Sequence, residues 1–439
     1  MQTNFSLTQL ADPAIAEADK ILRACVHCGF CTATCPTYVL LGDELDSPRG
    51  RIYLIKEMLE GGRAAAAEDT LHIDRCLSCL SCMTTCPSGV HYMHLVDHAR
   101  VHIEQTYRRP IFERLQRWWL AKSMPDPASF RLSIFLSHFG KPFAGLFSLV
   151  GMTRIAAMLR LAPWSLPTQP ALKQGEHAVF PAQGTRRGRV ALMSGCVDPV
   201  LKPSIRDAAI RLLNRHGIEV VLPKGEACCG SLSHHMGRED EAHAFVKNNI
   251  DAWTREIEGE GIDALLITAS GCGTTVKDYG YMLRLDPEYA GKAAKVAGLA
   301  RDISEYLDVL GIDAPAQVKG IRVAYHSACS MQHGQKILRE PKALLARAGF
   351  DVRDVPEGHL CCGSAGTYNL LQPEIAARLR DRKVSNIESV APAIVATGNI
   401  GCITQIGSAT SIPVVHTVEL LDWATGGPKP AAIMGGEFA

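Results

Sequence analysis

Apolar positions at helical spacing dominate the first part of the chain, whereas short apolar runs separated by helical stretches dominate the rest. The apolar residues of 1–24 recur on one side of a helix. Those of 51–60 do the same, and this pattern ends at Gly61 and Gly62. Residues 90–107 follow the same period. The sequence therefore predicts an N-terminal part made of helices and loops.

From about Gly188 onward, apolar runs of strand length alternate with helical patterns. Strands are expected within 189–195, 218–222, 263–268, 321–328 and 393–396, and helices at 202–216 and 239–258. Such alternation indicates parallel βαβ units. The expected fold class is α+β multidomain: an all-helical N-terminal domain, a helical connector, and then a duplicated α/β domain pair.

Composition indicates a cytoplasmic protein of several globular domains. The chain has 439 residues, 47% of them hydrophobic, and a formal net charge of +1, which gives no general attraction to nucleic acid. The N-terminus lacks the basic start and apolar core of a signal peptide, and no apolar run is long enough to span a bilayer. Sixteen cysteines in a reducing compartment point to metal binding rather than to disulfides.

Two cysteine runs share the spacing C-x2-C-x2-C-x3-C-P, at residues 25–36 and 76–87. This spacing is typical of two-cluster ferredoxins, in which three thiolates hold one 4Fe–4S cluster and the fourth cysteine ligates the other cluster. The runs predict a first cluster on Cys25, Cys28, Cys31 and Cys86, and a second on Cys76, Cys79, Cys82 and Cys35. Structural zinc sites usually use two separated C-x2-C pairs, so zinc is disfavoured.

The forty residues from Pro36 to Arg75 exceed what a compact β-ferredoxin hairpin holds. With helical patterns on both sides, this length favours an all-helical ferredoxin domain whose clusters lie in loops. Arg49 and Arg51 stand at the start of the helix predicted in this insert. They are candidates to donate to a cluster thiolate or to a partner carboxylate, and simple surface charge is the alternative.

Four histidines lie at helical spacing after the second run. His91, His94, His98 and His102 share one helix face. The favoured interpretation is a polar face packed beside other groups. Metal binding, redox tuning or proton transfer is the alternative, although no further ligand is indicated.

Residues 106–160 carry nine Lys or Arg and two acidic residues, interleaved with apolar and aromatic positions such as Trp118 and Trp119. Prolines cut this stretch into short helices, and residues 161–189 resemble a linker. We favour a connector packed on the protein's own domains or on a partner subunit. The alternative is a peripheral contact with the cytoplasmic face of the inner membrane, because basic residues with Trp and Phe suit that interface.

The remaining eight cysteines form a second repeat, C-x31-C-C-G followed by a distant single cysteine. They are Cys196, Cys228, Cys229 and Cys272 in the first half, and Cys329, Cys361, Cys362 and Cys402 in the second. The first three cysteines of each half are offset by 133 residues, which indicates an internal duplication. Both sets are expected at the carboxyl ends of parallel strands, in one crevice and its duplicate. Buried structural thiols are the alternative.

The order of these motifs resembles known redox families. The second repeat is similar to the cysteine-rich CCG domain of heterodisulfide reductases, and nearly the whole chain resembles the family of iron–sulfur subunits of bacterial glycolate oxidase (glycolate dehydrogenase). The segments CVHCGFCTATCPTY, DSPRGRIYLIKEM, DRCLSCLSCMTTCPSGV, ASGCGTT and CCGSAGTYNLL carry this resemblance. One departure is that Thr275 and Gln405 stand where a heterodisulfide reductase has a further cysteine, so each half offers four thiols.

The resemblance implies an electron-transfer subunit with no catalytic side chain of its own. Two 4Fe–4S clusters, joined by further iron–sulfur clusters if the CCG cysteines bind them, would carry electrons from FAD on partner subunits to a quinone or another carrier as glycolate is oxidised to glyoxylate. Consistent with this, the chain has no Gly-x-Gly-x-x-Gly that opens a helix after a strand. Alternatives are the iron–sulfur subunit of anaerobic glycerol-3-phosphate or lactate dehydrogenase, and a thiol or disulfide reductase working at a CCG cluster.

The patterns and motifs together divide the chain into five segments. These are a helical ferredoxin domain at 1–107, the basic aromatic connector and linker at 108–188, a first CCG domain at 189–318, a second CCG domain at 319–428, and a tail at 429–439.

Overall fold

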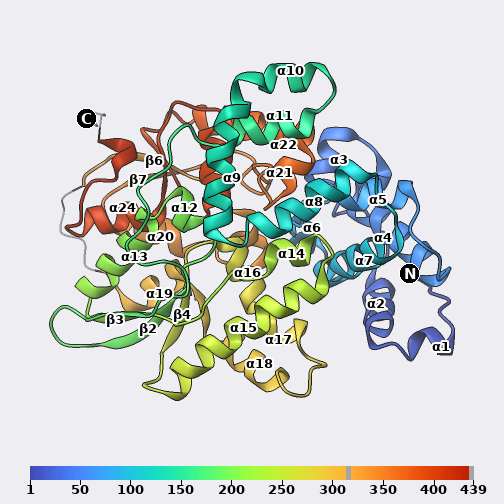
Figure 1. Cartoon of the computed structure of the whole chain (residues 1–439), viewed down its shortest axis with the longest axis horizontal. Coiled ribbons are helices and arrows are strands. Elements are labelled where there is room, and N and C mark those ends of the chain that lie inside the picture. Colours follow the sequence, from blue (N-terminus) through green and yellow to red (C-terminus); the bar gives the residue numbers. More distant parts are fainter. Residues whose placement is uncertain (313–317, 435–439) are drawn as a thin grey trace.

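Helices form the N-terminal part of the molecule, and two β-sheets with their own helices form the rest (Figure 1). The computed structural model describes residues 1–312 and 318–434. Residues 313–317, near the end of the predicted first CCG domain, and 435–439, in the predicted tail, lie outside the described residues. The described elements confirm the expected α+β class.

Residues 1–107, all of them described, form only helices and loops, as the sequence predicts. The elements are α1 (Leu7–Leu10), α2 (Pro13–Ala24), α3 (Pro36–Leu41), η1 (Glu44–Asp46), α4 (Pro48–Glu60), α5 (Ala67–Asp74), α6 (Ser81–Thr85) and α7 (Tyr92–Thr106). Asp12 and Ser47 cap α2 and α4, each before a proline whose fixed φ suits the first helical turn. Leu22, Ile55 and Leu95 bring these helices together in one core. The first cysteine run lies in a loop, whereas the second is part loop and part helix, since Cys82 lies in α6.

The connector consists of short helices that lie between the N-terminal domain and the sheets (Figure 1). They are α8 (Ile111–Ser123), α9 (Pro127–Gly140), η2 (Lys141–Phe143), α10 (Ala144–Leu149) and α11 (Thr153–Leu161). Leu120 and Met124 pack against Leu371 of the last domain, so the inner face of the connector is self-packed. Within the described residues, no helix has the length and apolar character needed to cross a membrane.

The first sheet has the strand order β1-β3-β2-β4-β5. Its elements are β1 (Ala178–Phe180), β2 (Gly188–Leu192), α12 (Asp198–Leu201), α13 (Ser204–Arg215), β3 (Ile218–Leu222), α14 (Ser231–His235), α15 (Glu239–Glu258), β4 (Ala264–Ile267), α16 (Ser270–Lys277), α17 (Tyr279–Met282), α18 (Ala290–Leu299), β5 (Ala300–Asp302) and α19 (Ile303–Leu310). All strand pairs are parallel except β1 with β3. Strand β1 lies inside the stretch expected to be a linker, and that stretch therefore also contributes an edge strand.

The second sheet, β7-β6-β8-β9, is parallel throughout and repeats the order β3-β2-β4-β5 of the first. Its elements are β6 (Arg322–Tyr325), η3 (Ser330–Gly334), α20 (Glu340–Arg347), β7 (Asp351–Asp354), α21 (Tyr368–Leu371), α22 (Pro373–Glu388), β8 (Ile394–Thr397), α23 (Ile400–Gly407), β9 (Val414–His416), α24 (Thr417–Ala424) and η4 (Ala431–Ile433). The duplication that the cysteine spacing predicts is therefore also a duplication of topology.

The two α/β halves share one continuous hydrophobic core, in which Val190 of the first sheet and Val323 of the second are fully buried. At its edge, Arg211 and Arg215 of α13 both bind the buried carboxylate of Asp422 on α24. Removing such a paired partner would leave a buried charge uncompensated, which is costly. The halves are therefore held face to face, and their strand ends are fixed relative to each other.

Candidate metal centres

The first cysteine run and the fourth cysteine of the second run meet around one small cavity. Cys25, Cys28, Cys31 and Cys86 all line it. Cys28 is exposed and Cys25 is buried, so this site lies at the surface of the N-terminal domain. The lining matches the crosswise set expected from the ferredoxin spacing, with Cys82 as an additional neighbour.

Both cysteine loops have an unusual backbone at equivalent positions. His27 and Gly29 have φ of 54° and 85°, and Ser78 and Leu80 have φ of 49° and 62°. Left-handed backbone is uncommon for residues other than glycine, and three of these four are not glycine. Alternating conformations of this kind turn successive N–H groups toward one point and create an anion-binding hollow of the type found at Fe–S sites. Both loops therefore fit an anionic cluster.

The thiols of the second set lie deeper. Cys35, Cys76, Cys79 and Cys82 are each less than a tenth exposed. Burial raises the pKa of Cys79 and of Cys82 well above the ordinary thiol value. Thiolates at these positions therefore need positive charge close by, which the iron of a cluster supplies when it is bound. The eight thiols and both loops fit two 4Fe–4S clusters.

Arg51 reaches this second set, as the sequence interpretation allows. Its side chain is 1% exposed, and its Nη1 lies 3.8 Å from the sulfur of Cys35. Its Nη2 donates to Thr37 Oγ1 at 3.0 Å and pairs with Asp46 Oδ1 at 3.3 Å. Burial opposes the charge on Arg51, yet the thiol of Cys76 and its other neighbours raise its pKa overall. Arg49 instead forms a partly exposed pair with Glu44.

We expect Arg51→Met to lower the free energy of unfolding by about 1–3 kcal/mol, because it leaves the buried carbonyl of His72 without its donor, while Arg75 stays paired with the Asp46 carboxylate. Arg49→Gln is the matched control, since loss of a surface pair costs about 0–1 kcal/mol. Denaturant unfolding of anaerobic protein, followed by circular dichroism, measures both changes. Equal stability of the two variants would contradict the structural role of Arg51.

The four histidines pack against neighbouring groups and do not converge on a metal. His94 bonds Asp278 at 3.0 Å and stacks on Tyr281. His102 contacts the carbonyl of Arg63 at 2.9 Å, on a different neighbour. Among the described residues, no histidine of this row belongs to a group of potential metal ligands. The favoured interpretation, a polar packing face, is the one that the contacts support.

All eight cysteines of the second repeat line one cavity of about 1170 Å³. Cys196 follows β2, the Cys228–Cys229 pair follows β3, and Cys272 lies in α16 after β4. Their counterparts follow β6, β7 and β8 in the same way. The expectation that they gather at strand ends is met. The two sets were expected in separate crevices, whereas the packing of the two halves opens them onto a common space.

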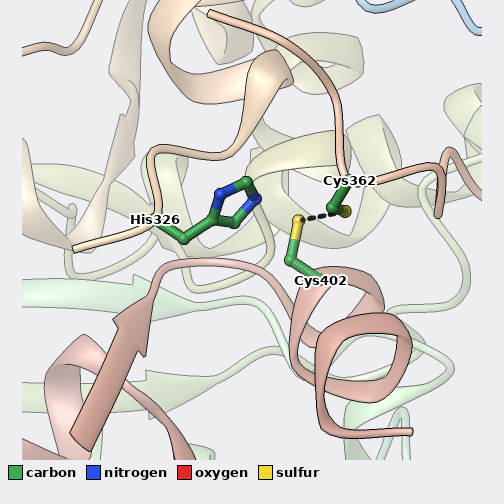
Figure 2. Close-up of side chains that lie close together, drawn as sticks. All are labelled: His326, Cys362 and Cys402. Carbon is green, nitrogen blue, oxygen red and sulfur yellow. Dashed lines mark hydrogen bonds between the residues drawn. The ribbon is translucent and has the colours of Figure 1, made fainter. Parts of the chain in front are cut away.

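The sulfurs of the second cysteine-rich set, on the second α/β half, lie close together in two pairs. Cys329 and Cys361 lie 3.6 Å apart, and Cys362 and Cys402 lie 3.5 Å apart. The side chain of His326 points toward the second of these pairs (Figure 2). The sequence analysis did not single out His326. A signal was available, because His326 stands three residues before Cys329 whereas the first half has Met193 in that place.

The eight cysteines of the second repeat form a first cysteine-rich set on the first α/β half and a second cysteine-rich set on the second half. These two cysteine-rich sets differ in their electrostatic surroundings. Near the first set, burial raises the pKa of Glu226 to about 7 and that of Asp198 to about 6. Near the second set lies the buried ammonium of Lys383, whose pKa burial lowers and the neighbouring thiols Cys362 and Cys361 raise. Burial is the larger effect, so the pKa of Lys383 lies below its ordinary value. The first cysteine-rich set thus lies near carboxyl groups, and the second near an amine.

The second ferredoxin run packs directly on the second cysteine-rich set, which is Cys329, Cys361, Cys362 and Cys402. Leu77 and Cys79 share a buried cluster with Cys361 and Tyr368, and Cys329 packs against it. The hydroxyl of Tyr368 donates to the carbonyl of Arg75 at 3.0 Å, just before the run. The sites therefore form a row. It runs from the exposed first ferredoxin set, through the buried second ferredoxin set, to the second cysteine-rich set at the strand ends of the last domain.

Two protein families match the chain along these same segments. A 4Fe-4S dicluster domain matches residues 24–90, and a cysteine-rich domain matches residues 190–277 and 323–407. The chain is thus an iron–sulfur protein that joins a dicluster ferredoxin domain to two cysteine-rich domains. It belongs to the family of glycolate oxidase iron–sulfur subunits, since it is 42% identical over 433 residues to that subunit of Escherichia coli (strain K12), covering 97% of this chain and 99% of the relative.

Other relatives agree with this placement. The probable glycolate oxidase iron–sulfur subunit of Bacillus subtilis (strain 168) is 30% identical over 430 residues, covering 92% of this chain and 94% of the relative. Lactate utilization protein A of the same organism is 25% identical over 241 residues, which cover 53% of this chain and 99% of the relative. The similarity to the glycolate oxidase subunits thus extends over nearly the whole chain.

Proposed function

We propose that this chain carries electrons from the reduced FAD of a partner subunit to a quinone or another carrier during oxidation of glycolate to glyoxylate. The observation that carries the proposal is the row of three cysteine sites. The first ferredoxin set reaches the surface at Cys28, and the second ferredoxin set contacts the second cysteine-rich set through Cys79. A partner docked at the exposed loop would thus reach a continuous path.

The reaction balances with the chain as a relay. Oxidation of glycolate to glyoxylate releases two electrons and two protons, which the partner's flavin takes up. The 4Fe–4S clusters, when bound, accept and release one electron each. A quinone at the far end takes two electrons and two protons to become a quinol. The residues of this chain hold the thiolates, exclude water from the second set and place a cation, Arg51, beside it.

The exposed loop of the first run suits the partner's flavin side. Phe30 and Val26 are both well exposed beside Cys28. Apolar side chains around an exposed cluster loop provide contact area for a docked protein and exclude water there. We place the flavoprotein on this loop, so that electrons enter at the first set.

The test compares the isolated chain with its complex. The chain alone should not reduce a dye with glycolate, whereas the chain with its flavoprotein partner should, and should also reduce quinone. A flavoprotein that reduces quinone equally well without this chain would overturn the proposal. D-lactate and glycerol 3-phosphate, assayed in parallel, separate glycolate from the alternative substrates, because the partner chooses the substrate.

A second function, thiol or disulfide reduction at the cysteine-rich cavity, is favoured by one observation. The eight cysteines of the second repeat and Cys76 line a single cavity large enough for a small molecule. This function predicts that the isolated chain, reduced by a dye, will cleave a disulfide. Electron transfer to quinone predicts no such activity.

The connector has an apolar outer face that we assign to the membrane surface. Among the described residues, fourteen of the 26 exposed large hydrophobic side chains lie between Ile111 and Met152. Phe135, Leu136 and Phe139 on α9 are each more than half exposed. Apolar side chains on a basic segment suit the boundary of an anionic bilayer, where a quinone is available. The inner face of the same helices covers the cysteine-rich cavity.

Arg117 lies on the inner side of the connector, away from this outer face. Arg117 is 7% exposed and donates to the carbonyl of Met236 at 3.1 Å, and its pKa is lowered by burial. A charge reversal there would disturb folding rather than docking. Trp118 and Trp119 are 49% and 41% exposed, so both remain candidates for the outer face.

We expect the double variant Phe135→Ser, Phe139→Ser to bind vesicles of anionic lipid more weakly and to keep its iron. Burial of apolar area contributes about 25 cal/mol per Å², so two lost rings should weaken binding at least about tenfold. Leu285→Ser is the control, because Leu285 is 63% exposed but lies on the first α/β half. Vesicle flotation measures binding. Unchanged flotation with weakened flavoprotein binding would assign the face to a partner subunit instead.

A further inference from the structure

His326 is a buried side chain without a partner. It follows β6, is 1% exposed, and neither of its ring nitrogens has a hydrogen-bond partner among the described residues. A buried polar group left unsatisfied costs about 1–3 kcal/mol, so each such group in a folded protein needs an explanation. A ligand that the side chain would bind is one such explanation.

The neighbours of His326 are metal-binding groups. One ring nitrogen and the sulfurs of Cys362 and Cys402 all lie within 4.8 Å of one another (Figure 2). All three residues are buried, and the two sulfurs are 3.5 Å apart. Two thiolates bound to one tetrahedral ion at about 2.3 Å lie about 3.8 Å from each other. The pair is therefore spaced for a single metal ion, with the imidazole beside it.

The backbone and side chains around this pair are already arranged around the sulfurs. Asn399 Nδ2 lies 3.5 Å from the sulfur of Cys402, and the N–H of Gly363 donates to that of Cys361 at 3.4 Å. Hydrogen bonds to the sulfurs are among the groups that set the potential of an iron–sulfur centre. The buried ammonium of Lys383, held by the carbonyl of Glu357 at 2.8 Å, adds positive charge. These surroundings suit thiolates that bind iron.

We propose that His326 is a ligand of an iron ion in an iron–sulfur centre held by the second cysteine-rich set. The proposal rests on the proposed function, since it assumes that this set is a redox site. The imidazole adds a fifth donor to Cys329, Cys361, Cys362 and Cys402. It thereby compensates for the position where Gln405 stands in place of a further cysteine.

The first set does not have this donor. Met193 occupies the position equivalent to His326, and it is 3% exposed within the core. The duplicated sites therefore differ in chemistry although they share their topology. In Rieske centres, histidine in place of cysteine raises the reduction potential. His326, together with Lys383, makes the second set the more oxidising of the two.

The test uses the anaerobically purified full chain, labelled with ¹⁵N-histidine. Pulsed EPR on the signal of the second set should show a ¹⁵N coupling from a bound imidazole. His326→Cys should retain iron, lose the coupling, and shift the potential of that signal to a more negative value. Met193→Ala, the matched control in the first half, should leave the coupling unchanged.

Three results would contradict the proposal, and one further variant supports it. A second-set signal that lacks ¹⁵N coupling, or keeps it in His326→Cys, would overturn ligation by His326. Zinc bound in the second set in place of iron would overturn the iron assignment. His326→Ala, which removes the donor without adding one, should lower the iron content. Glycolate-driven dye reduction by the complex tests the relay separately, because it depends on the flavin and the ferredoxin clusters.

Discussion

Replacing Cys35 by serine should damage the cluster of the second cysteine run, although Cys35 belongs to the first run. The structure supports this expectation from both sides. Cys35 lies beside Arg51 in the buried interior, and the thiol of Cys76 from the second run also raises the pKa of Arg51. Cys86 instead lines the cavity of the first run. The crossing follows from the ferredoxin spacing, in which the fourth thiolate turns away from its own loop.

The matched variant is Cys86→Ser, which should damage the first cluster and spare the second. Electron transfer to quinone should fall in both, because the two sites lie in series. EPR at graded potentials distinguishes the clusters and shows which signal each variant loses. If each substitution perturbs only the cluster of its own run, the crosswise assignment is wrong.

The sequence predicts the elements well because their determinants are local. Helix α4 begins at a Ser–Pro pair and ends at Gly61, and both signals lie within the helix's own turns. The position of each cysteine at a strand end is also predictable, because parallel βαβ units bring all strand ends to one edge. The repeated spacing then predicts the repeated sheet order.

The remaining features depend on how the domains pack, which local patterns do not encode. The common cavity exists because α13 and α24 hold the two halves face to face. Composition alone places Arg117 on the surface, yet α8 turns it toward the carbonyl of Met236 on the first α/β half. His326 is apparent only once the strand end places it beside two sulfurs, one from the loop after β7 and one from helix α23.

We propose an order of reduction potentials along the row from these surroundings. The first ferredoxin set is exposed to water at Cys28, and the second ferredoxin set is buried beside Arg51. The second cysteine-rich set lies near Lys383. Buried cations stabilise the reduced forms of the inner sites, since charge interactions are stronger away from water. On the proposed path, electrons that enter at the surface would move inward with a favourable change in free energy.

Cys361→Ser should interrupt this path at its inner end. Cys361 packs with Cys79 of the second ferredoxin run and lies 3.6 Å from Cys329, so its loss removes a ligand where the two sites meet. We expect glycolate-driven quinone reduction by the complex to fall at least about tenfold, the lower end of the cost of losing even a supporting group of a metal site. Both ferredoxin EPR signals should persist.

Cys228→Ser is the matched control, because it alters the equivalent cysteine pair in the first α/β half. Cys79 of the second ferredoxin run contacts the second cysteine-rich set, to which Cys361 belongs. Cys228→Ser should therefore reduce quinone turnover less than Cys361→Ser. Iron analysis completes the test: about 8 irons per chain correspond to two 4Fe–4S clusters, and about 16 to four. If Cys361→Ser leaves both iron and quinone reduction unchanged, the second set is not on the path; if Cys228→Ser has the larger effect, electrons leave through the first half.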